Sequence, residues 1–183
     1  GLILGKTEGK IVTTTPSLTI SGTKVLRKDG VEQNSGRDFK FQLTDENGKV
    51  VGKATADLST GVFTISPNKT YTEAGTYCYY LGEVDDKRAG VVYDTAKYKI
   101  EIEIIKNETN LLGVNFVSYK VGSATVTKEG DLSSTVAVDK TPNADGSYLL
   151  KIEGDAFTNT MTTPLELKIV KTDKDSPETR LPG

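Results

Sequence analysis

Apolar and polar residues alternate with a period of two along most of the chain. The clearest example is residues 98–104, where Tyr98, Ile100, Ile102 and Ile104 are separated by lysine and glutamate. This alternation is typical of a strand with one buried face. Comparable runs, several of them ended by turn-forming residues, predict at least eight short strands: residues 18–26, 39–43, 63–65, 77–83, 98–104, 117–121, 148–152 and 157–161.

The strands follow one another with short polar connections, and no stretch has a convincing helical period. The chain also contains 25 threonines against 9 alanines, which favours strands over helices. An all-β, antiparallel β-sandwich is the architecture that this pattern predicts. We expect the sandwich domain at residues 17–162, a lead-in strand or linker at residues 1–16, and the start of a following module or linker at residues 163–183.

The composition excludes several classes of function. The 183 residues include no histidine, which excludes histidine-based triads and nearly all catalytic zinc sites. A single cysteine, Cys78, excludes an internal disulfide and a cysteine-based metal cluster. The net charge of −2 argues against nucleic acid as a partner, and no apolar run is long enough to span a membrane in this fragment. No cofactor and no metal site is expected.

Three polar residues occupy positions where the alternation calls for apolar ones. Lys24, Glu83 and Asn159 each share the parity of the apolar residues around them, on three different strands. Lysine and glutamate are almost never fully buried unless they are paired. One interpretation is structural: an ion pair capped by the asparagine amide, or a lysine that extends its amine to solvent at a strand end.

The other interpretation is chemical. Burial lowers the pKa of a lysine and raises that of a glutamate, so both become neutral more easily. A neutral Lys24 amine is a nucleophile for the Asn159 carboxamide, and Glu83 could polarise the carbonyl and shuttle the proton while ammonia leaves. The product is an amide cross-link between Lys24 and Asn159. One local feature opposes this geometry: Gly82 could mark a bulge that turns Glu83 outward.

Five segments follow one another along the chain: LTISGTKVL, FKFQL, GTYCYYLGEV, GVVYDTAKYKIEIEI and AFTNT. In this order they resemble the streptococcal pilin isopeptide linkage domain (group A streptococcus major-pilin-like) over about residues 17–162. The resemblance implies an immunoglobulin-like β-sandwich whose first and last strands are joined by a self-formed Lys–Asn isopeptide bond. It implies that Lys24 and Asn159 are the bonded pair and that Glu83 promotes the reaction. These are the residues that the alternation singles out.

The last segment, LKIVKTDKDSPETRLPG, is similar to the opening of a collagen-binding-protein B-type repeat. In that family the lysine of the KTD motif, here Lys171, is an isopeptide partner, and we expect Lys171 to be unlinked without its partner strand. The final LPG also fits a truncated sortase signal, and the sequence does not separate these two interpretations.

We therefore expect a structural stalk or shaft domain of a Gram-positive pilin or adhesin. Its localisation would be extracellular and attached to the cell wall, and its partners would be neighbouring domains or pilus subunits. It would not be an enzyme, since the bond forms once per chain. The alternative is an adhesin domain that binds a host glycan or matrix protein, for which the tyrosines at residues 77–80, with Tyr80 facing outward, are the only hint.

Overall fold

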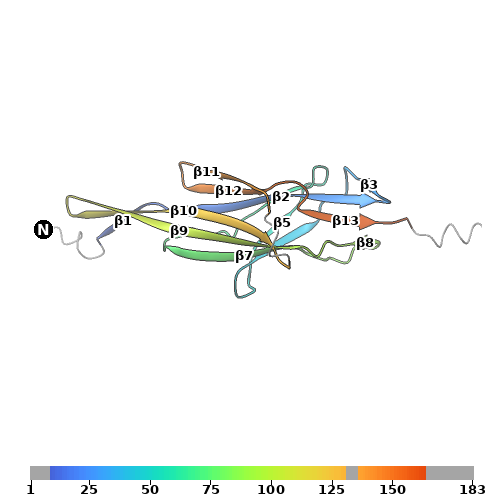
Figure 1. Ribbon diagram of the computed structural model, residues 1–183, viewed down its shortest axis with the longest axis horizontal. Helices are drawn as coiled ribbons and strands as arrows, with labels where there is room; N and C mark the ends of the chain where they lie inside the picture. Colours follow the sequence, from blue (N-terminus) through green and yellow to red (C-terminus); the bar gives the residue numbers. More distant parts are fainter. Residues whose placement is uncertain (1–8, 131–135, 164–183) are drawn as a thin grey trace, which may run out of the picture.

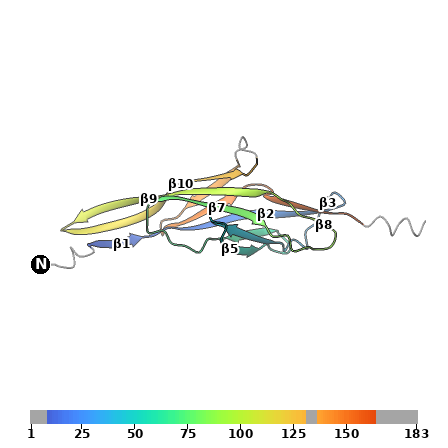
Figure 2. The same ribbon diagram turned by 90° about the horizontal axis from the view of Figure 1, so that it is seen from below.

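The structure is a computed structural model that describes residues 9–130 and 136–163. Within these ranges the regular elements are all strands, arranged in two sheets that form an elongated sandwich (Figures 1 and 2). The described residues include no helix long and apolar enough to cross a membrane. The predicted all-β sandwich is confirmed.

The first sheet has six strands, and its outer members are β1 and β5. The long β9–β10 hairpin extends beyond the other strands toward the N-terminal end of the molecule (Figures 1 and 2). In spatial order the strands are β1 (Lys10–Thr14), β10 (Val114–Lys128), β9 (Lys97–Leu111), β7 (Gly75–Glu83), β4 (Lys40–Thr44) and β5 (Val50–Thr55).

The second sheet is built around β2, the longest strand in it, which also pairs with two short strands. In spatial order, five of its strands are β11 (Val138–Pro142), β12 (Ser147–Ile152), β2 (Ser17–Lys28), β13 (Phe157–Met161) and β8 (Val91–Val92). The two short strands that also pair with β2 are β3 (Val31–Glu32) and β6 (Val62–Ile65).

Three of the strand pairs are parallel, so the sheets are mixed and not purely antiparallel. They are β1 with β10, β12 with β2, and β13 with β2. None of these pairs is consecutive along the chain, so no tight hairpin imposes an antiparallel direction on them. The parallel pairing of β2 with β13 joins the first and last strands of the second sheet and positions the candidate site.

The core lies between the sheets and consists mostly of the inward residues that the alternation predicts, with additions such as Tyr71 and Val126 that lie outside the predicted runs. Phe41 and Phe63 stack with ring centroids 4.1 Å apart, and Phe157 packs 4.9 Å from Phe41. Each predicted run coincides with a strand of the structure, to within one residue at Phe39: β2, β4, β6, β7, β9, β10, β12 and β13. The structure adds β5 and β11, which have no strong alternation, and the two-residue strands β3 and β8.

Candidate functional site

Lys24 and Asn159 lie on the same face of two adjacent strands. In the parallel pairing of β2 and β13, Phe157 is opposite Lys24 and Asn159 is opposite Leu26. Residues two apart on a strand face the same side of the sheet, so the Lys24 and Asn159 side chains both enter the core. Both residues have no exposed surface.

Glu83 reaches the same place from the other sheet. It is the last residue of β7, where it lies opposite Phe41 of β4. The pairing of β7 with β4 and with β9 is regular through Gly82, so no bulge interrupts the alternation at this glycine. Glu83 therefore keeps the inward parity of Leu81, and its side chain is 1% exposed.

The structure brings the three predicted site residues together around one carboxyl oxygen. Nζ of Lys24 lies 2.7 Å from Oε2 of Glu83, and Nδ2 of Asn159 donates a hydrogen bond of 3.1 Å to the same oxygen. The prediction that these side chains face inward is confirmed. The ion pair spans the interior of the sandwich and connects its two sheets.

Burial drives both ionisable groups of this cluster toward their neutral forms. It lowers the pKa of Lys24 and raises the pKa of Glu83, although each group's charge partly offsets the shift in the other. The amine of Lys24 has Oε2 of Glu83 as its 2.7 Å partner, and Oε1 of Glu83 has no hydrogen-bond partner among the described residues. Buried charges with few hydrogen-bond partners are costly, so transfer of the proton from the Lys24 amine to the Glu83 carboxylate becomes easier than in water.

An aromatic ring shields the lysine from solvent. Phe39 places its ring centroid 4.9 Å from Nζ of Lys24 and 4.0 Å from the guanidinium carbon of Arg88. Tyr93 packs edge-on against the same ring, 5.7 Å away. Arg88 also donates a 2.7 Å hydrogen bond to the backbone carbonyl of Asp38. The segment between β7 and β9 is thus fastened over the cluster.

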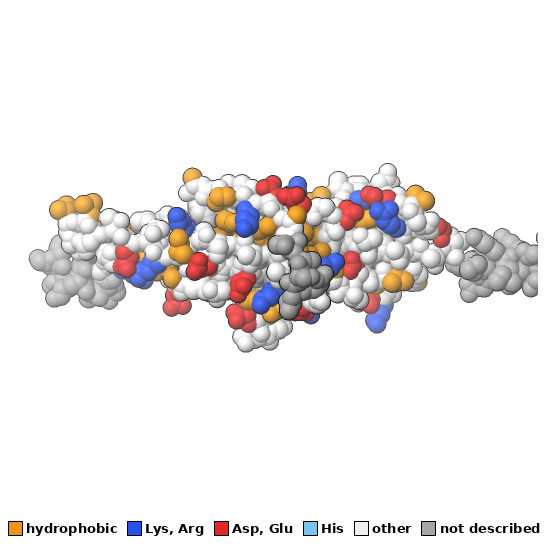
Figure 3. Space-filling view, in the orientation of Figure 1, with side chains coloured by type: hydrophobic (Ala, Val, Ile, Leu, Met, Phe, Trp, Pro, Cys, Tyr) orange, Lys and Arg blue, Asp and Glu red, His pale blue; other side chains and the backbone are white. Residues whose placement is uncertain are grey.

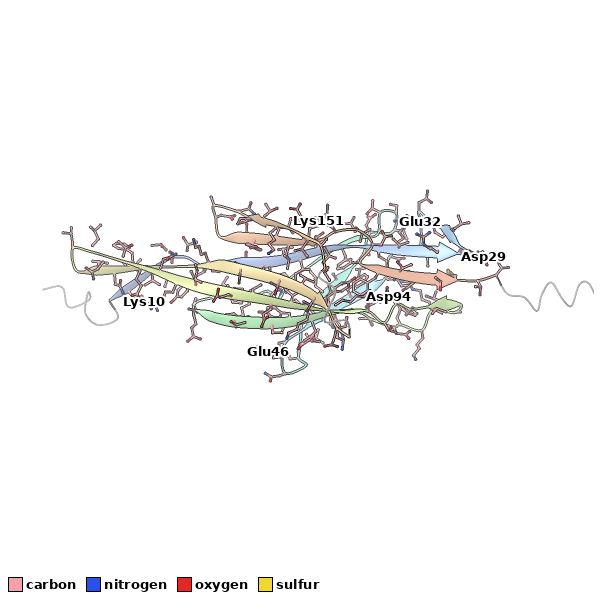
Figure 4. All side chains as sticks on the ribbon, in the orientation of Figure 1. Lys10, Asp29, Glu32, Glu46, Asp94 and Lys151 are labelled. Carbon is pink, nitrogen blue, oxygen red and sulfur yellow. The ribbon has the colours of Figure 1, made fainter. Side chains whose placement is uncertain are left out.

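Asp94, in this same segment, fixes the orientation of the asparagine amide. Its backbone N–H donates a 2.7 Å hydrogen bond to Oδ1 of Asn159. Its carboxylate accepts hydrogen bonds of 2.8 Å from the backbone N–H groups of Ala96 and Thr158. Figure 4 shows Asp94 beside β13. The sequence pattern did not single out Asp94, because an aspartate followed by threonine and alanine in a loop is typical of an ordinary turn.

A buried tyrosine anchors the start of β13. The hydroxyl of Tyr98 donates a 2.5 Å hydrogen bond to the carbonyl of Ala156, and the Tyr98 ring meets Phe157 edge-on at 5.3 Å. Tyr98 is on the inward parity of β9, and a buried tyrosine hydroxyl usually finds a partner. Its inward position was predicted, but its partner on β13 depends on how the two sheets pack.

Other site chemistries have less support in the described part of the chain. There, no group of three or more histidine, cysteine, aspartate or glutamate residues is placed to hold a metal ion. The large hydrophobic residues exposed in the described ranges are all aliphatic, so the tyrosines of residues 77–80 form no exposed aromatic cluster. The face in Figure 3 carries acidic and basic side chains interspersed, with no field of one sign.

Comparisons with known proteins point to one family. The family model described as FctA, a Spy0128-like isopeptide containing domain, matches residues 20–162. Among solved structures, the chain is similar to the major pilin protein (T-13) from Streptococcus pyogenes, with a TM-score of 0.43 and 15% identity. That match covers 82% of this chain and 54% of the pilin chain, so this chain spans about half the pilin's length. No curated protein matches the chain. The last segment, for which we predict a likeness to a collagen-binding-protein B-type repeat, lies outside the described residues, and so does its Lys171.

Proposed function

The chain belongs to the family of Spy0128-like isopeptide-containing domains, and on this basis we propose that it is a structural shaft or stalk domain of a Gram-positive pilin or adhesin. In this proposal an amide bond between Lys24 and Asn159 braces the domain, and Glu83 promotes its formation. The observation that carries the proposal is the shared contact of the Lys24 amine and the Asn159 amide with one oxygen of Glu83, at 2.7 Å and 3.1 Å.

The reaction balances with these three side chains alone. A proton passes from Nζ of Lys24 to Glu83, which leaves a neutral amine and a neutral acid. The Nζ lone pair then attacks Cγ of Asn159, and the carbonyl electron pair moves to Oδ1. Glu83 gives a proton to Nδ2 and takes one from Nζ. The carbonyl re-forms as the Cγ–Nδ2 bond breaks, so one ammonia leaves and Glu83 is left as the neutral acid. Glu83 returns to the carboxylate when the departing ammonia or solvent takes this proton.

The fold supplies what this chemistry needs. The two reactants are held side by side on paired strands, so the entropic cost of bringing them together is met during folding. Burial favours the neutral amine, which alone has a free lone pair. The bond forms once per chain, and the reaction is self-modification without turnover.

The position of the bond suits a mechanical role. The described chain begins and ends at opposite ends of the long axis (Figure 1). A covalent link between β2 and β13 would carry tension directly from the first strand of the second sheet to the last one. The strands between Lys24 and Asn159 would then be shielded from force. The proposed setting is an extracellular, cell-wall-attached pilus or adhesin, with neighbouring domains or subunits as partners.

The mass of the intact, denatured protein tests the proposal. We expect the wild-type chain to weigh one ammonia less than its sequence, and Lys24→Met, Glu83→Gln and Asn159→Ala to have their full calculated masses. Fragmentation after digestion should find the residues around Lys24 and Asn159 in one branched peptide. A folded wild-type protein of full calculated mass would overturn the proposal and leave the cluster as a buried ion pair.

A further inference from the structure

We propose that Asp94 completes the cross-linking site: its backbone N–H stabilises the negative charge that develops on Oδ1 of Asn159, and its carboxylate locks that N–H in place. This inference rests on the proposed Lys24–Asn159 reaction. It adds an electrostatic donor on the side of the carboxamide opposite Glu83.

The hydrogen bond from Asp94 decides which way the amide faces. A backbone N–H can only donate, so the Asn159 atom that lies 2.7 Å from it must be the carbonyl oxygen. Nδ2 then faces Oε2 of Glu83 at 3.1 Å. The nitrogen that must leave as ammonia thus lies against the group that protonates it, and the oxygen that must accept the electron pair lies against a donor.

This arrangement divides the work between the two groups. As Nζ of Lys24 bonds to Cγ of Asn159, the carbonyl π electrons collect on Oδ1, where the Asp94 N–H hydrogen bond strengthens. When the Cγ–Nδ2 bond breaks, the electron pair returns to the carbonyl and the hydrogen bond weakens again. A donor that is already in place at the site of developing charge lowers the barrier without reorganising. Glu83 moves protons, and Asp94 moves none.

The carboxylate of Asp94 is a positioning group for its own backbone. Its two oxygens accept 2.8 Å hydrogen bonds from Ala96 N–H, two residues on, and from Thr158 N–H, the residue before Asn159. The first bond closes a turn that begins at Asp94, and the second ties Asp94 itself to β13 beside Asn159. The short strand β8, just before this turn, pairs with β13 through Val92 and Thr160 and adds a second fastening.

A rate measurement on newly made chains tests this assignment. Chains are synthesised in a cell-free system, samples are quenched in acid at intervals, and the loss of one ammonia is followed by intact mass. Folding is followed in parallel by protease resistance, so that only folded, unreacted chains enter the rate. Replacing residue 94 by the α-hydroxy analogue of aspartate exchanges the N–H for an ester oxygen and leaves the side chain intact.

We expect this ester to slow cross-linking by about 10²–10³-fold, the range seen when one donor to a developing oxyanion is removed. The matched control is the same ester at Asp45, whose N–H donates a 2.9 Å backbone hydrogen bond to Lys49 in a remote turn. The Asp45 ester should react at the wild-type rate. Equal rates for the two esters in folded chains would overturn the oxyanion role of Asp94.

The carboxylate is tested by Asp94→Ala and Asp94→Asn. Loss of both acceptors in Asp94→Ala should slow the reaction on the order of 10- to 100-fold, because small misplacements of reacting groups cost that much. Asp94→Asn retains one acceptor and should recover part of the rate. The control is Asp145→Ala. It removes the same kind of turn hydrogen bond, which the Asp145 carboxylate accepts from the Ser147 N–H, but at an exposed site.

A second readout separates this role from a merely structural one. Burial lowers the pKa of Lys24 and raises that of Glu83, and the negative charge of Asp94 contributes an upward shift to both pKa values, while the positive charge of Arg88 contributes a downward shift to that of Lys24. The pH–rate profile of Asp94→Asn should therefore move to lower pH. An unshifted profile together with a wild-type rate would overturn the inference. If the wild-type chain itself never lost ammonia, the proposed function would fail instead, so the two failures are distinguishable.

Discussion

Lys24 and Asn159 lie diagonally across two parallel strands, in a register that places Phe157 opposite Lys24 and Asn159 opposite Leu26. Because paired residues and residues two apart on a strand share a face, both side chains enter the core from the same side of the sheet. A one-residue slip of β13 would turn Asn159 to the other face and bring Thr158 or Thr160 inward. The register of the strand pair is therefore the structural requirement on which the proposed bond depends.

The proposed bond should add substantially to stability. It closes most of the domain into one loop, and the chain-entropy treatment of disulfides gives about 5 kcal/mol for loops of on the order of 100 residues. For a domain of this size that corresponds to roughly 10–20 °C in the melting temperature. We expect Asn159→Ala to lower the melting temperature by at least this amount, measured by calorimetry.

A double-mutant comparison isolates the bond from the packing of Asn159. In a Glu83→Gln background, which we expect to remain unlinked, Asn159→Ala should cost only its local contacts. The difference between the two backgrounds is the contribution of the cross-link. Equal costs in both backgrounds would show that no bond contributes to the stability of the wild-type chain.

The alternation of the sequence predicted eight of the strands and the inward positions of Lys24, Glu83 and Asn159, because apolar side chains alternate clearly on β2, β7 and β13. It did not predict β5, and the reason lies at Gly52. A Cβ at Gly52 would lie 2.3 Å from the carbonyl oxygen of Ser66, so close backbone contact requires a glycine there. The inward positions of β5 are thus Gly52 and Ala54, which are too small to give an apolar signal.

The residues that contact Lys24, Glu83 and Asn159 were harder to predict from the sequence than these three residues themselves. Asp94 acts through its backbone N–H, and the identity of a residue carries no information on where its peptide group points. The contact of Arg88 with Phe39 likewise depends on the path of a loop over the sheet edge. Parallel pairing of β2 with β13 is a property of the whole topology, which no local pattern specifies.

The rate of cross-linking should have a bell-shaped dependence on pH. The reactive pair is a neutral amine with a neutral acid, which holds as many protons as the ion pair. At low pH both groups are protonated and the ammonium has no lone pair, and at high pH both are deprotonated and Glu83 has no proton to give. Burial lowers the pKa of Lys24 and raises that of Glu83. The two apparent pKa values of the rate profile should therefore lie closer together than the ordinary pKa values of 10.5 for lysine and 4.5 for glutamate.

The two apparent pKa values of this rate profile belong to the coupled Lys24–Glu83 pair and not to either residue alone. The profile is measured from the ammonia loss of folded, unreacted chains at fixed ionic strength. A rate that rises steadily with pH and never falls would contradict the role of Glu83 as an acid, since it would depend only on deprotonation of Lys24.

Gly61 should be required for the position of Lys24. Its φ is +73°, and its carbonyl accepts a 2.7 Å hydrogen bond from the backbone N–H of Lys24. A Cβ at this position would lie 2.1 Å from the carbonyl oxygen of Lys24. We expect Gly61→Ala to lower the free energy of unfolding by more than about 2 kcal/mol, because backbone strain and a clash with backbone act together.

Gly82→Ala is the matched control, since a Cβ there meets no atom within 4 Å. It should change the free energy of unfolding by less than about 1 kcal/mol. Both substitutions are compared by urea unfolding in the Glu83→Gln background, so that neither chain is cross-linked. A larger loss for Gly82→Ala than for Gly61→Ala would contradict this account of the Lys24 backbone.

Tyr98 should hold β13 in the register that the reaction needs. Tyr98→Phe leaves the Ala156 carbonyl without the hydrogen bond that the hydroxyl donates at 2.5 Å. Leaving a buried acceptor unpaired should lower the free energy of unfolding by about 1–3 kcal/mol and slow ammonia loss in folded chains. The control is Tyr77→Phe, whose more exposed hydroxyl donates at 3.0 Å to Glu73 and should cost less than about 1 kcal/mol. Cross-linking at the wild-type rate in Tyr98→Phe would show that the Tyr98 hydroxyl is not needed to hold β13 in this register.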